Sequence, residues 1–183
     1  MAFSSHALSL FLVLLVAWSS SPTVLAAGNQ GLGLVHIHLY MHETSVGPNA
    51  TFARILASPL GANSSFGVTG VVDNELRAGP DRASSELVGR FQGLIVGAGL
   101  QPGMGYFTSV TLVFTAGEYS GSTLSIQGSV PSFAVTFERT VVGGTGAFRF
   151  VRGYSLTKML PNPTAETSVF QIDVFLLMHS ANI

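Results

Sequence analysis

The chain has 183 residues, of which 47% are hydrophobic and only 9% are charged, and its formal net charge is −1. A chain of this length and composition can bury a sizeable core in one domain, which excludes a disordered protein and a coiled coil. The eight Lys and Arg residues and the near-zero charge exclude a general attraction to nucleic acid or to anionic membranes, and the absence of cysteine excludes disulfides.

The first 26 residues are typical of a signal peptide. The apolar run "ALSLFLVLLVAW" (7–18) is too short to span a bilayer comfortably, and small residues follow it up to Ala26 and Ala27. We therefore expect residues 1–26 to form a signal peptide, residues 27–183 to form the mature domain, and the protein to be secreted. An uncleaved anchor is the alternative, and no later segment could cross a membrane as a helix.

Two sequons gain meaning if the chain is secreted. "NAT" begins at Asn49 and "NSS" begins at Asn63, and both lie in stretches rich in Gly, Pro or Ser that are typical of surface loops. We predict glycosylation at Asn49 and Asn63.

The mature chain is a succession of candidate strands separated by turns. In the first, residues 33–43, apolar residues from Val35 to Met41 alternate with His36, His38, Tyr40 and His42, as expected for the two faces of a strand. The other candidate strands cover residues 50–56, 66–73, 87–97, 105–115, 122–128, 133–142, 147–157 and 168–178. Eight or nine strands at this spacing predict a β-sandwich or an antiparallel barrel. Glycines within strands favour the barrel, whose curvature they permit: Gly70, Gly89, Gly93 and Gly153.

The segment "VVGGTGAFRFVRGY" (141–154) contains three glycines in four positions. A dinucleotide-binding loop needs a helix after its glycines, whereas an alternating segment typical of a strand follows here. Aromatic residues beside arginine could stack nucleic-acid bases, but the chain contains too few basic residues to favour that function. We therefore predict a β-hairpin whose second strand begins at Ala147 and presents Phe148 and Phe150 on one face.

Five motifs together resemble the plant dirigent family, and the resemblance runs from about Leu34 to Met178. They are "LYMHETSVGPNAT", "FGVTGVVDNELRAGP", "SELVGRFQG", "TLVFTAGEYSGSTLSIQG" and "VVGGTGAFRFVRGY". The resemblance implies an eight-stranded antiparallel β-barrel of calycin-like form, a homotrimer, and secretion to the cell wall (apoplast). It implies binding of phenoxy radicals or quinone methides, which a separate oxidase such as a laccase or peroxidase supplies. The family steers their coupling in phenylpropanoid (lignan and lignin) metabolism, some members acting in defence, and no metal or organic cofactor is implied.

The resemblance also identifies candidate site residues. Glu43 stands where the family usually has Asp, so it is the candidate acid or base. Val130 and Phe137 match positions where lignan-forming members carry a pocket Asp and Arg, and Phe170 matches a pocket aromatic residue. Arg139 lies two residues after Phe137 and therefore on the same strand face, where it could partly replace the missing arginine.

Two alternatives remain open. Because Val130 and Phe137 remove two polar groups, the chain could be a non-catalytic binding protein of the cell wall or of defence. The other alternative is a cupin-like metal barrel, since His36, His38 and Glu43 resemble the first cupin metal motif. The second cupin motif is absent from the sequence, which weakens this hypothesis.

Overall fold

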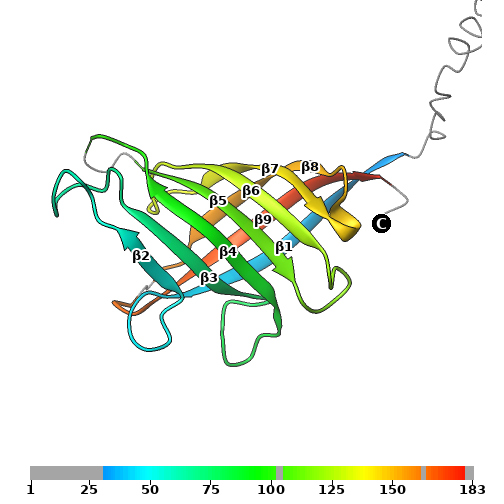
Figure 1. Cartoon of the computed structure of the whole chain (residues 1–183). Helices are drawn as coiled ribbons and strands as arrows, with labels where there is room; N and C mark the ends of the chain where they lie inside the picture. The colour runs from blue at the N-terminus through cyan, green and yellow to red at the C-terminus, as the bar shows by residue number, and fades with distance from the viewer. Residues whose placement is uncertain (1–30, 102–104, 162–163, 180–183) are drawn as a thin grey trace, which may run out of the picture. The chain divides into compact units, whose positions relative to one another are not determined.

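The computed structural model describes residues 31–101, 105–161 and 164–179, which form one all-β unit. Its strands wind around a barrel (Figure 1). The strands are β1 (Leu32–Thr44), β2 (Phe52–Leu56), β3 (Thr69–Arg77), β4 (Leu87–Gly97), β5 (Tyr106–Phe114), β6 (Thr123–Val130), β7 (Phe137–Thr145), β8 (Arg152–Met159) and β9 (Thr167–His179). The expected signal peptide lies outside the described residues and stays a prediction.

Pairing between β1 and β3 closes the barrel. The strand order is β1-β9-β8-β7-β6-β5-β4-β3-β2, all neighbours are antiparallel, and β1 also pairs with β3 from Tyr40↔Arg77 to His42↔Glu75. The short strand β2 pairs only with the first part of β3, so eight strands make the barrel and β2 is an appendage. The eight-stranded antiparallel barrel predicted from the family resemblance is confirmed.

Alternating side chains separate the barrel interior from its outer face. In β1, Ile37, Leu39 and Met41 are buried, whereas His36 and His38 are exposed, as the sequence pattern predicts. His42 departs from the pattern because it is buried beneath the loop between β3 and β4, where its Nε2 lies 3.1 Å from the Gly79 carbonyl oxygen.

One end of the barrel is filled by side chains. A 3₁₀ turn, η1 (Gly146–Phe148), follows β7 and directs Phe148 into the core, where it is fully buried against Phe114 and Tyr119. The glycines permit this path: Gly146 has a positive φ of 60°, and a Cβ at Gly144 would lie 2.6 Å from the Phe148 Cβ. The "GGTG" stretch therefore lies in a β7–β8 hairpin whose connection closes one end of the barrel.

The sequence prediction was wrong about how this hairpin continues. The second strand begins at Arg152 rather than at Ala147, and Phe148 and Phe150 do not share a face. Phe150 is 86% exposed with a φ of 61°, whereas Phe148 is buried. The alternating "AFRFVRGY" pattern is misleading because its first four residues form the 3₁₀ turn and the connection.

Strand β3 is also longer than predicted. The sequence pattern predicts a strand that ends at residue 73, but β3 continues to Arg77 and Asp73 lies in its middle, paired with Gln92. Its carboxylate accepts a hydrogen bond of 2.7 Å from Arg90 Nε across the strand pair. Within the described residues, no helix has the length and hydrophobicity that a membrane span requires.

Candidate functional site

The other end of the barrel contains a cavity of about 460 Å³. It lies where β1, β6 and β8 end and where β5, β7 and β9 begin, so six strands contribute their terminal side chains to it. Most of its lining is apolar and aromatic: Met41, Phe52, Val72, Phe91, Ile95, Tyr106, Val130, Phe133, Phe137, Met159 and Phe170. Its volume falls in the range of roughly 300–1,000 Å³ that is typical of small-molecule sites.

A buried arginine provides the positive charge of this cavity. Arg139 is 3% exposed, and its guanidinium donates hydrogen bonds to Thr108 Oγ1 (Nη1, 3.2 Å) and to Thr157 Oγ1 (Nη2, 3.0 Å). It also lies over the rings of Phe91 and Phe137, at 5.7 and 5.3 Å from their centroids. Burial lowers the pKa of Arg139 to about 10, which still leaves the side chain charged at neutral pH.

Arg139 forms no ion pair with a carboxylate in the described part of the chain, and its buried Nε has no hydrogen-bond partner there. Buried charges in proteins are normally paired, and unpaired buried donors are rare. The arginine is therefore available for an oxygen atom of a bound molecule.

Glu43 brings a carboxyl group to the same cavity. It lies near the end of β1 and accepts hydrogen bonds from Asn74 Nδ2 (3.3 Å) and Ser45 Oγ (3.2 Å). Asn74 is fully buried, and its Oδ1 has no donor within the described residues. The lining of the cavity thus contains a carboxyl group as well as the guanidinium.

All five predicted site residues line this one cavity. Val130 and Phe170 are buried in its wall, and Phe137 and Arg139 both point inward from β7, as their spacing indicates. Phe170 packs edge-to-face against Phe133, with ring centroids 5.8 Å apart. The arrangement brings the predicted residues together; their roles stay predictions.

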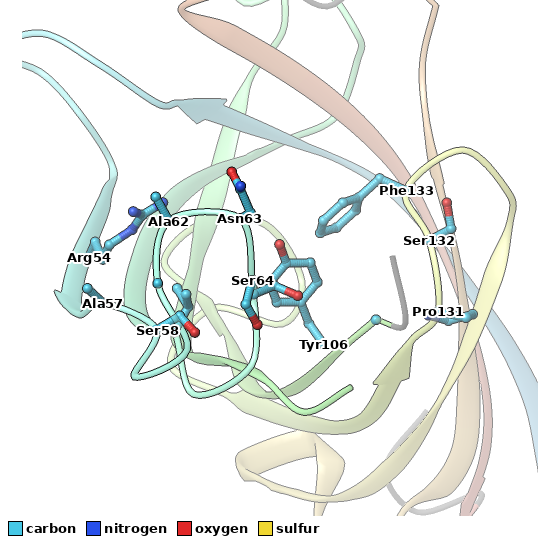
Figure 2. A pocket seen from close by; sticks show the side chains of 14 residues that line it. Arg54, Ala57, Ser58, Ala62, Asn63, Ser64, Tyr106, Pro131, Ser132 and Phe133 are labelled. Atoms are coloured by element: carbon cyan, nitrogen blue, oxygen red, sulfur yellow. The ribbon is translucent and has the colours of Figure 1, made fainter. Parts of the chain in front are cut away.

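A second, more open cavity of about 710 Å³ adjoins the first. Its walls are the connection between β2 and β3 and the segment that follows β6, and it shares Tyr106 and Phe133 with the inner cavity. Figure 2 shows the rings of these two residues lying between the two walls. Tyr106 and Phe133 therefore lie at the boundary between the outer and the inner cavity.

Both predicted glycosylation residues are exposed in loops, as a glycan requires. Asn63 lines the outer cavity, where Figure 2 shows its side chain beside Ser64. Asn49 lies in the loop between β1 and β2.

Several lining residues were missed in the sequence. Asn74 could have been found by continuing the alternation of Val72 beyond Asp73, where the predicted strand ends. The same reasoning places Phe91 inward, between the inward-facing glycines Gly89 and Gly93 of β4. Thr108 and Thr157 carry no local signal, because they reach Arg139 from other strands: Thr157 from the neighbouring β8 and Thr108 from β5.

The structure does not bring together the three residues of the cupin-like metal motif, His36, His38 and Glu43. Glu43 lines the interior cavity, whereas His36 and His38 lie on the outer face of β1. The two histidines contact Asp173 of β9 instead.

Comparison with known proteins gives one consistent result. Residues 34–177 match the family model described as "Dirigent-like protein". Over 180 residues the chain is 38% identical to dirigent protein 21 of Arabidopsis thaliana, covering 92% of this chain and 94% of that protein. Pterocarpan synthase 1 of Glycyrrhiza echinata is 39% identical over 164 residues, covering 86% of this chain and 84% of that protein.

A solved structure of a pterocarpan synthase dirigent protein has a similar fold. It superposes with a TM-score of 0.72 at 35% sequence identity, covering 81% of this chain and 86% of that chain.

Proposed function

The chain belongs to the dirigent family, and on that premise we propose that its inner cavity binds a phenolic intermediate and steers the bond that this intermediate forms. The intermediate is a quinone methide or a phenoxy radical, and a separate oxidase such as a laccase or peroxidase generates the radical. One observation carries the proposal: a guanidinium that pairs with no carboxylate of the described residues lines the same aromatic cavity as a carboxyl group.

The polar groups suit the chemistry of a quinone methide. When a nucleophile adds to the exocyclic carbon, the ring becomes aromatic and the former carbonyl oxygen becomes a phenolate. Arg139 donates hydrogen bonds to that oxygen, and the dry, aromatic surroundings strengthen the interaction. Glu43 accepts the proton of the attacking hydroxyl group and returns a proton to the phenolate. The aromatic walls hold the ring with one face toward the nucleophile, which fixes the handedness of the product.

Two reactions fit this arrangement. Coupling of two phenoxy radicals leads toward lignans and lignin, and some members of the family act in defence. Ring closure is favoured by the likeness to relatives named pterocarpan synthase and by the carboxyl group of Glu43 inside the cavity. Both reactions need only binding and orientation from the barrel.

We also propose where the protein acts, how it is processed and how it assembles. Residues 1–26 act as a signal peptide that delivers residues 27–183 to the apoplast, where Asn49 and Asn63 carry glycans and three copies assemble into a homotrimer. N-terminal sequencing of the secreted protein tests the cleavage site, and a mass shift on enzymatic removal of N-glycans tests both sequons.

The coupling function is tested with coniferyl alcohol and a laccase, with and without the protein. We expect an enantiomeric excess in the coupled products only when the protein is present, measured by chiral chromatography. A parallel reaction contains an isoflavanol bearing a free phenol, from which loss of water gives a pterocarpan, and measures the rate and handedness of ring closure.

Glu43→Gln removes the acid while keeping the shape of the side chain, so we expect the selectivity or the ring-closure rate to fall at least tenfold. Glu138→Gln is the matched control, because Glu138 is exposed on the outer face of β7. Racemic coupling and no ring closure at saturating protein would support the alternative of a non-catalytic binding protein. Full activity in Glu43→Gln would show that the carboxyl group has no catalytic role.

A further inference from the structure

A cluster of two histidines and an aspartate lies on the outer face of the barrel, away from the cavity. Asp173 Oδ1 lies 2.8 Å from His36 Nε2 and 2.6 Å from His38 Nδ1. The sheet register produces this arrangement: Asp173 of β9 is directly opposite His38 of β1, and His36 is the next residue along the same face of β1. The cluster is therefore built on two rigid, hydrogen-bonded strands.

Neighbouring side chains hold each member of the cluster in place. The Tyr40 hydroxyl lies 3.0 Å from His38 Nε2, and Gln171 Nε2 donates a hydrogen bond of 2.8 Å to Asp173 Oδ2. The His36 ring stacks on Phe175, with centroids 4.5 Å apart and an interplanar angle of 2°. Such outer contacts fix the orientation and tautomer of metal ligands in known metal sites.

We propose that His36, His38 and Asp173 bind one divalent transition-metal ion, and that Zn²⁺ suits the three ligands best. One nitrogen from each imidazole and one carboxylate oxygen all lie within 4.8 Å of one another, and two imidazoles with a carboxylate are a common ligand set for zinc. Three protein ligands leave the fourth position of a tetrahedral ion open to water or to an external ligand.

The proton positions are compatible with this binding. A neutral imidazole carries one proton, so His38 binds a metal through Nδ1 when its proton is on Nε2. The Tyr40 oxygen next to Nε2 is placed to accept a hydrogen bond from that proton, and the ion displaces the Nδ1 proton that His38 shares with the Asp173 carboxylate in the metal-free protein. His36 binds through Nε2 with its proton on Nδ1. The side chains of His36 and His38 are 48% and 39% exposed, so an ion reaches them directly from solvent.

The proposal is tested on tag-free secreted protein that has been treated with EDTA and dialysed. We expect titration calorimetry with ZnCl₂ to show one ion per chain. We also expect CoCl₂ to produce a visible absorption band of a four- or five-coordinate ion, which Zn²⁺ abolishes by displacement. His36→Gln combined with His38→Gln should abolish both signals, and Asp173→Asn should weaken Zn²⁺ binding at least tenfold.

Two further variants test whether Zn²⁺ binding depends on the contacts of this cluster. Tyr40→Phe removes the partner of His38 and should weaken Zn²⁺ binding by roughly 10- to 100-fold. Asp73→Asn is the matched control, because it makes the same change to an exposed aspartate whose carboxylate contacts Arg90 and Gln92 rather than histidine. Circular dichroism confirms that each variant is folded.

Absence of saturable Zn²⁺ binding, or equal affinity in the double histidine variant, would overturn the proposal. The result is independent of the proposed function, because the cluster lies on the outer face. Ligand binding in the cavity should stay unchanged in all four variants.

Discussion

Burying the charge of Arg139 lowers the stability of the fold, whereas its proposed role is to bind a ligand. A buried guanidinium without a carboxylate partner is costly, and replacing a buried charge by a well-packed apolar side chain is often neutral or stabilising. The charge is therefore explained better by ligand binding than by stability. Arg139 lies two residues after Phe137, so both side chains enter the cavity from the same face of β7.

We predict that Arg139→Met keeps or raises the melting temperature but weakens binding of a phenolic ligand. A hydrogen bond to a charged group contributes roughly 1.5–3 kcal/mol, so its loss should raise the dissociation constant about 10- to 100-fold. Calorimetric titration with coniferyl alcohol in the absence of oxidase measures this change. Arg152→Met is the control, because Arg152 is exposed on β8; equal affinity in wild type and Arg139→Met would contradict the role of the guanidinium.

At the scale of elements, a small network of charged side chains stabilises the seam, which is the pairing of β1 with β3 that closes the barrel. Glu75 Oε2 accepts hydrogen bonds from Arg77 Nε (2.7 Å) and Arg82 Nε (2.9 Å), which tie the β3–β4 loop to the seam. The hydrogen bond from Arg82, opposed by burial and reinforced by Arg77, lowers the pKa of Glu75 to about 2. Burial likewise lowers the pKa of His42 beneath the same loop, so the folded state favours its neutral form.

These pKa shifts predict a loss of stability in acid. The Glu75 carboxylate contributes fully above about pH 4.5, and its contribution is lost as the pH falls toward 2. The contribution of neutral His42 is present above its unfolded pKa of 6.5 and decreases below that pH. Glu75→Gln should lower the free energy of unfolding at pH 7 by on the order of 2 kcal/mol, and the difference from wild type should shrink near pH 2.

Urea denaturation at pH 7 and near pH 2 measures this difference. Asp73→Asn serves as the control, because the Asp73 carboxylate is 54% exposed and its pair with Arg90 should contribute less than about 1 kcal/mol. A difference between Glu75→Gln and wild type that persists undiminished at low pH would contradict the assignment.

Glycines within strands allow neighbouring backbones to approach closely. A Cβ at Gly153 of β8 would lie only 2.0 Å from the Phe175 carbonyl oxygen of β9, so a side chain there forces the two strands apart. Gly153→Ala should lower the free energy of unfolding by roughly 1–3 kcal/mol, as measured by urea denaturation. Gly31→Ala is a fitting comparison, since a Cβ at Gly31 meets nothing within 4 Å. Equal stability of the two variants would show that the contact at Gly153 relaxes without cost.

Sequence patterns predicted these elements well where each strand has one buried face. Period-two alternation identified β1 and the inward direction of Phe137 and Arg139, because burial enforces the alternation. The pattern failed at Asp73, where a residue typical of turns lies mid-strand because Arg90 pairs with it across the sheet. It also failed at Phe148, which alternates like a strand residue but is turned into the core by flanking glycines.

At the scale of the whole barrel, the two ends differ in how side chains fill them. Phe148, Phe114 and Tyr119 fill one end, whereas the other end contains the inner cavity, which Tyr106 and Phe133 separate from the outer one. Rigid packing at the filled end supports the precise placement of groups at the open end. The sequence predicts a barrel and several wall residues, but it does not show that Arg139 pairs with no carboxylate of residues 31–101, 105–161 and 164–179, because this depends on which strands surround the side chain.

The most direct measurement is a crystal structure of the protein with coniferyl alcohol, without oxidase and at saturating concentration. We expect electron density for one flat aromatic molecule in the inner cavity, with an oxygen atom within hydrogen-bond distance of Arg139 and its ring against the aromatic wall. A cavity that holds only water while coniferyl alcohol binds elsewhere would contradict the proposed function.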